Sequence, residues 1–94
     1  MEKVVEDSGG LPRSLDNSFP KFRMLIDGRH FYRIDGPEEF TEIQIIGTRR
    51  TIHDIKATAY PEKLRVRQMI DMSDGLYTEI DALRWEEEWE ATGR

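Results

Sequence analysis

Two histidines are the side chains of this chain best suited to acid–base chemistry, because imidazole titrates near neutral pH. His53 is followed directly by Asp54, but adjacent residues of a strand point to opposite faces, so the two cannot form a catalytic dyad unaided. His30 lies beside a predicted tight turn and opposite Leu25 in the expected hairpin. We therefore expect both histidines to be structural or surface residues.

Other motifs that would indicate catalysis or ligand binding are missing from the sequence. The chain has no cysteine, which excludes disulfides, thiol nucleophiles and cysteine-ligated metal sites. It also has no glycine-rich phosphate loop, no His-Glu-x-x-His motif and no EF-hand loop. We therefore expect a non-enzymatic protein with no catalytic residue, no metal and no cofactor; a small enzyme is the last of the alternatives.

The sequence also bears on location. Absence of cysteine suits a reducing compartment, and residues 1–10 contain no apolar run of signal-peptide length. No stretch approaches the length of a membrane span. We therefore expect a soluble, cytoplasmic protein without a membrane partner.

Charge is distributed unevenly along the 94 residues, whose formal net charge is −5. Residues 21–70 carry a net charge of +3, whereas residues 71–94 carry −6. A basic sheet surface with aromatic side chains would suit single-stranded nucleic acid, although the overall acidic charge opposes it. Nucleic-acid binding is therefore the alternative function, and its candidate residues are Arg49, Arg50, Lys63, Arg65, Arg67 and Tyr60.

The elements that position these residues begin with a hairpin over residues 21–34. Asp27 and Gly28 separate two segments of alternating character, which is the strongest short-range hairpin signal. A type I′ turn at these two residues pairs Met24 with Phe31 and places them on one face. We assign that face to the core, because its first strand carries the bulkier apolar side chains.

Three further strands are expected, over residues 40–46, 51–60 and 64–72. The last of these segments has the clearest alternation of apolar and charged residues in the chain. A helix that begins at Pro61 is the alternative for this segment, since proline is favoured in the first turn of a helix. Strand is the preferred interpretation.

A helix over residues 79–91 is predicted to follow the strands, and it carries two apolar stripes instead of one. Ile80 and Leu83 form one stripe, and Trp85 and Trp89 dominate the other. The first hypothesis is that the tryptophans pack in the core, because buried aromatics dominate core energetics. The alternative is that they form an exposed ridge that docks a partner, since tryptophan is enriched at interface hot spots.

Residues 1–20 are rich in glycine, proline, serine and charge, and we expect them to form a flexible N-terminal arm. Residues 21–94 should form a single α+β domain: an antiparallel sheet of about five strands, mostly a meander, with one C-terminal helix packed on it. The arm could also order on a partner through its few apolar residues.

The function expected from the sequence is a small accessory or regulatory module that binds another protein, whose identity the residues do not specify. Lack of catalytic motifs favours this interpretation, and the partner would be met by the ridge of Trp85 and Trp89, by the arm or by an exposed sheet face. The candidate partner-binding residues are Trp85, Trp89, Leu11, Leu15 and Phe19.

Overall fold

The computed structural model describes residues 18–93, so most of the predicted arm lies outside it. Within the described residues the chain forms five strands, two α-helices and one 3-10 helix. In chain order these are β1 (Lys21–Leu25), β2 (His30–Gly36), β3 (Glu39–Ile46), β4 (Arg49–Lys56), α1 (Tyr60–Asp71), η1 (Ser73–Gly75), β5 (Tyr77–Glu79) and α2 (Ala82–Ala91).

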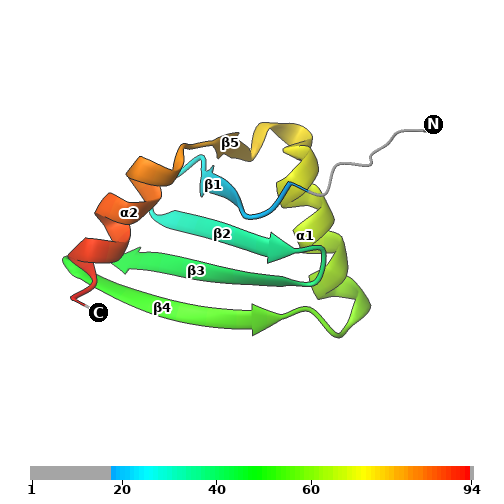
Figure 1. The fold of residues 1–94 in the computed structure, drawn as a ribbon, viewed down its shortest axis with the longest axis horizontal. Coiled ribbons are helices and arrows are strands. Elements are labelled where there is room, and N and C mark those ends of the chain that lie inside the picture. The colour runs from blue at the N-terminus through cyan, green and yellow to red at the C-terminus, as the bar shows by residue number, and fades with distance from the viewer. Residues whose placement is uncertain (1–17, 94) are drawn as a thin grey trace, which may run out of the picture.

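The described strands form one antiparallel sheet in the order β4-β3-β2-β1-β5 (Figure 1). Strands β1 to β4 are a meander, and the short β5 pairs with β1 at the opposite margin from β4. The α+β fold predicted from the sequence, with a mostly meandering sheet of about five strands, is confirmed.

The first hairpin has the predicted register, with Met24 opposite Phe31. Its turn differs from the expected type I′ geometry, because Gly28 has a φ of 72° while Asp27 is not left-handed. The Gly28 N–H donates to the carbonyl oxygen of Leu25 at 2.8 Å, so Ile26 and Asp27 are the central residues of the tight turn. Gly28 follows them in the left-handed conformation, which glycine adopts without steric cost.

Residues 64–72 are not a strand, which corrects the preferred prediction. They belong largely to α1, which has proline in its first turn and buries Val66 and Met69. These side chains pack against Tyr32 and Ile34 of β2, on the sheet face opposite the one assigned to the core. Both sheet faces are therefore covered by a helix, and β5 takes the place of the fifth strand.

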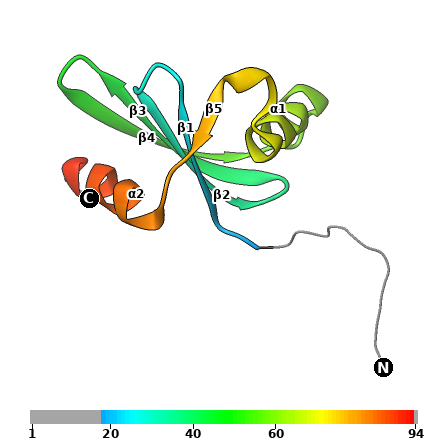
Figure 2. The same ribbon diagram turned by 90° about the horizontal axis from the view of Figure 1, so that it is seen from above.

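The two helices cover opposite ends of opposite faces of the sheet (Figure 2). One apolar cluster lies beneath α1 and includes Tyr32, Phe40 and Met69. A second cluster lies beneath α2 and includes Phe31 and Trp85. Each face consequently keeps one half that no helix within residues 18–93 covers, and on the α1 face this open half carries polar side chains.

Candidate functional site

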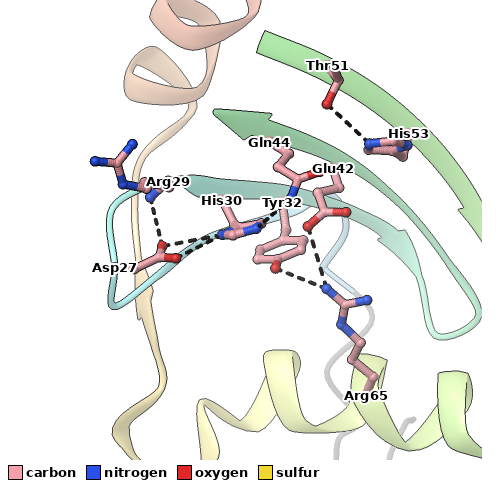
Figure 3. Close-up of polar contacts among 9 residues, drawn as sticks. All are labelled: Asp27, Arg29, His30, Tyr32, Glu42, Gln44, Thr51, His53 and Arg65. Atoms are coloured by element: carbon pink, nitrogen blue, oxygen red, sulfur yellow. Dashed lines mark hydrogen bonds and ion pairs between the residues drawn. The ribbon is translucent and has the colours of Figure 1, made fainter. Parts of the chain in front are cut away.

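The open half of the α1 face is a polar surface that contains both histidines (Figure 3). The strand register places His30 opposite Gln44 and Gln44 opposite Thr51, with Glu42 opposite His53 in the next row. We call these five residues the polar half-face. Their side chains share one face because residues opposite each other in antiparallel strands point the same way.

His30 is held at both ring nitrogens. Its Nδ1 lies 3.1 Å from Oδ2 of Asp27, and its Nε2 lies 3.3 Å from Nε2 of Gln44. One tautomer satisfies both contacts: Nδ1–H donates to the carboxylate, and the amide N–H donates to Nε2. The pKa of Asp27 lies below its usual value, mainly because its carboxylate accepts the backbone N–H of Arg29 and also because His30 is near. Because both nitrogens are engaged, His30 is not a free general base.

Arg65 reaches back from α1 to the edge of the polar half-face. Its Nη2 donates to the hydroxyl of Tyr32 at 3.1 Å and lies 3.6 Å from Oε2 of Glu42. Burial, followed by the nearby Glu42 carboxylate, raises the pKa of the Tyr32 phenol well above its usual value. The three side chains therefore act as a polar bracket between helix and sheet, and Arg65 is not a freely exposed cation.

The remaining polar contact of this surface joins His53 and Thr51, with Nε2 and Oγ1 3.2 Å apart. Adjacent to it, Asp54 points to the other sheet face and bonds Thr41, as expected for neighbouring strand residues. Within residues 18–93, no group of three or more His, Asp or Glu side chains could hold a metal ion. The polar half-face is thus a hydrogen-bonded surface in which His53 contacts the hydroxyl of Thr51 and His30 contacts Asp27 and Gln44.

The predicted basic sheet face does not form, because its candidate residues lie on different surfaces. Arg50 bonds Glu88 of α2 at 3.0 Å, on the opposite face of the sheet from Arg65. Arg49 is exposed at the start of β4. The remaining candidates, Tyr60, Lys63 and Arg67, lie on α1 and not on a strand.

The outer side of α1 brings those three residues together with Leu64, and the four line a shallow hollow. We call them the outer stripe; their helical spacing places them on one side of α1, away from the buried Val66. Tyr60 is 74% exposed and Leu64 is 41% exposed. Lys63 lies 3.6 Å from a carboxylate oxygen of Glu38. Sequence reasoning missed Leu64 because strand periodicity assigned it to the core, whereas helical periodicity would have placed it beside Tyr60.

The tryptophans of α2 pack on the sheet. Trp85 is 1% exposed, its ring centroid lies 6.1 Å from those of Phe22 and Trp89, and Trp89 is half-buried. The Arg33 guanidinium lies over both indole rings, at 5.8 and 5.9 Å from their centroids. Leu83, by contrast, is 69% exposed. The core hypothesis for the tryptophan stripe is confirmed, and the alternative of an exposed tryptophan ridge is wrong.

The apolar residues proposed as arm anchors have different outcomes. Phe19 packs against the apolar cluster beneath α1, and Lys21 Nζ lies 5.6 Å from its ring centroid. Leu11 and Leu15 lie outside the described residues. Phe19 is therefore part of the folded domain, although the sequence pattern assigned it to the arm.

Comparison with known proteins gives no functional assignment. Neither α-helix within residues 18–93 has the length and apolar character needed to cross a membrane. The chain matches no protein-family model, no curated protein and no solved structure. The functional argument therefore rests on the surfaces of the domain itself.

Proposed function

We propose that this protein is a small non-catalytic accessory module that binds another protein through the outer stripe of α1. The observation that carries the proposal is the pair formed by Tyr60 and Leu64, exposed one helical turn apart and flanked by Lys63 and Arg67. Aromatic side chains flanked by cations recur at interface hot spots, where a large apolar area is gained with little loss of conformational entropy.

The chemistry of the outer stripe indicates the kind of partner. Its apolar pair suits a partner segment with apolar side chains, and the two cations suit carboxylates beside that segment. Arg67 is exposed, and Lys63 contacts only the exposed carboxylate of Glu38 among the ion pairs of the described residues. A partner carboxylate can therefore approach both cations without breaking a buried interaction.

The polar half-face supports a non-catalytic role, since both nitrogens of His30 already have partners. Arg65 contacts Tyr32 and Glu42, so its guanidinium is likewise less available to bind a substrate. A cytoplasmic location, expected from the lack of cysteine, stays part of the proposal.

Affinity capture with matched variants tests the proposal. The double substitution Tyr60→Ser with Leu64→Ser removes the apolar pair, and Leu83→Ser removes a more exposed leucine from α2. Because all three side chains are exposed, we expect melting temperatures close to that of the parent. Proteins retained by the parent should be retained by the Leu83 variant and lost from the double variant; equal retention by all three proteins would exclude the outer stripe as the binding surface.

Nucleic-acid binding stays the alternative, because Tyr60, Lys63 and Arg67 are also suited to stacking and phosphate contact. A salt titration against mixed single-stranded nucleic acid separates the two functions. We expect no binding at physiological salt, given the net charge of −5. Affinity that falls steeply with salt, with a slope that Arg67→Ala reduces by about one, would instead support nucleic-acid binding.

A further inference from the structure

Strand β4 is the outermost strand of the sheet and leaves a long free edge (Figure 1). It has eight residues and pairs with β3 along its whole length without a shift in register. The opposite margin is formed by β5, which has three residues. A long regular edge is a ready template for another strand, and folded proteins usually protect such an edge.

The hydrogen-bonding pattern shows which residues of β4 present their backbone to this edge. Ala57 N–H donates to the carbonyl of Glu38 at 2.7 Å, and residues opposite each other in antiparallel strands alternate between bonded and non-bonded pairs. Residues 51, 53 and 55 therefore bond β3. The N–H and C=O groups of Arg50, Ile52 and Asp54 consequently point away from the sheet.

We propose that β4 pairs antiparallel with β4 of a second copy of this chain, about a two-fold axis at Ile52. In this register Arg50 lies opposite Asp54 of the second copy, and Asp54 lies opposite its Arg50. The two five-stranded sheets become one continuous sheet, and the outward backbone groups of both strands bond each other.

Charge complementarity selects this register over its neighbours. An axis at Thr51 leaves Arg50 and Asp54 opposite uncharged residues. An axis at His53 sets Arg50 opposite Lys56, and an axis at Asp54 sets two carboxylates against each other. Opposite charges directly across a strand pair are stabilising and like charges are destabilising, so the register centred on Ile52 is favoured among those with an axis at residues 51 to 54.

The side chains of the free edge suit this pairing. Arg50, Ile52 and Asp54 all point to the α2 face, since Ile52 packs on the apolar cluster that contains Trp85. Ile52 is half-buried in one chain, and at the axis it would meet its own copy and join the two clusters. Arg50 already bonds Glu88, and its planar group has further N–H donors for a carboxylate of the second copy.

The proposed pairing is closed, because a two-fold interface uses the same surface on both copies. Two short β5 strands become the margins of the joined sheet, so no long edge remains within the described residues for further growth. The outer stripe of α1 lies on the side of α1 away from the sheet, so a dimer would present two copies of it. This inference does not depend on the proposed function, since pairing of β4 requires no other partner.

A charge-reversal experiment tests the pairing. Sedimentation equilibrium should show the parent as a concentration-dependent dimer. Arg50→Asp and Asp54→Arg each set like charges opposite each other in a homodimer, so we expect the dimer dissociation constant to rise at least about tenfold for either variant. An equimolar mixture of the two variants restores two opposite-charge pairs and should form a heterodimer close in affinity to the parent dimer. A parent that stays monomeric, or variants that dimerise like the parent, would overturn the proposal.

Cross-linking provides a second measurement that is independent of these charge changes. Since the chain has no cysteine, Ile52→Cys introduces a single thiol at the proposed axis. The two α-carbons of a bonded antiparallel pair lie about 5.5 Å apart, within the range that a disulfide spans. Mild oxidation should therefore produce a covalent dimer from Ile52→Cys and none from the control Lys56→Cys, whose copies would lie about 27 Å apart along the strands. Equal cross-linking of both variants, or of neither, would exclude this register.

Discussion

Helices α1 and α2 each cover one end of the same sheet, but different kinds of side chain hold them there. Under α2 the contact is aromatic: Trp85 is buried beside Phe22 and stacks on Trp89. Under α1 the inward side chains are Val66 and Met69. Helix α1 itself therefore contributes no aromatic side chain to the buried contact, and hydrogen bonds add to its attachment to the sheet.

Arg23 provides two of those hydrogen bonds. It is 5% exposed, and its guanidinium donates to the carbonyls of Met69 at 2.9 Å and Ile70 at 3.2 Å. These carbonyls belong to the last turn of α1, where Met69 also accepts the backbone N–H of Met72 at 3.3 Å. A buried cation thus completes the C-terminal end of α1, whereas aromatic packing secures α2.

The difference explains why the exposed aromatic side chain of the domain is on α1. In α2 the large indoles face the sheet because β1 and β2 offer Phe22, Phe31 and Arg33 beneath them. In α1 the inward positions hold Val66 and Met69, which pack against Tyr32 in the buried cluster. The size of an aromatic side chain therefore does not decide its exposure; the sheet surface opposite the helix does.

The largest expected effect separates the two helices by core packing. Trp85→Ala should lower the free energy of unfolding by about 3–5 kcal/mol, because it removes a buried indole and leaves a cavity. Tyr60→Ala should change it by less than about 0.5 kcal/mol, since Tyr60 is 74% exposed. Urea denaturation measures both values. Similar losses for the two variants would contradict the assignment of Trp85 to the core and Tyr60 to the surface.

The next effect tests the polar attachment of α1. Arg23→Met keeps an apolar stem but removes the side-chain donor that the carbonyls of Met69 and Ile70 share, and we expect a loss of about 1–3 kcal/mol in the free energy of unfolding. Arg29→Met, at an exposed position, is the matched control and should be nearly neutral. Amide hydrogen exchange should localise the loss to α1. Equal protection of α1 in both variants would show that Arg23 does not stabilise the helix end.

The pH dependence of unfolding tests the contact of Tyr32 in β2 with Arg65 in α1. The pKa of Tyr32 is raised in the folded protein, so the unfolded chain releases this proton first, near pH 10.0. Between the unfolded and folded pKa values the unfolded state binds fewer protons, and stability falls by up to about 1.4 kcal/mol for each pH unit. Tyr32→Phe should remove this alkaline loss, and Tyr60→Phe should not. An unchanged alkaline profile for Tyr32→Phe would mean that another group titrates.

The smallest effects concern the two helix starts, which differ in capping. Asp81 caps α2 by accepting the Arg84 N–H at 2.8 Å, so Asp81→Ala should cost about 1 kcal/mol. Ala59 occupies the equivalent position of α1 with extended backbone and no side-chain cap. Ala59→Asp should therefore add about 0.5–1 kcal/mol by accepting the Glu62 N–H. Thermal melts of the two variants should shift in opposite directions; shifts of the same sign would refute the comparison.

Elements whose signals are local could be predicted from the amino-acid sequence. Gly28 marked the first hairpin, and alternation around it fixed the pairing of Met24 with Phe31. The β-branched segments gave β3 and β4 to within a few residues, and the apolar spacing of residues 79–91 gave most of α2. These signals need only the chain's own geometry, because turn conformation and side-chain period act over a few residues. These local signals could not predict that both ring nitrogens of His30 have partners, since Gln44 approaches it from another strand.

Packing between distant residues determines that residues 60–71 are helical and which apolar stripe of each helix is buried. Alternation at Leu64 and Val66 satisfies a strand, while spacing of Val66 and Met69 satisfies a helix, so local pattern alone is ambiguous. The helix prevails because Tyr32 and Ile34 form a second apolar sheet face that needs a cover, and a helix presents Val66 and Met69 to it together. The same choice turns Tyr60 and Leu64 outward, which makes the outer stripe a consequence of packing between residues far apart in the chain.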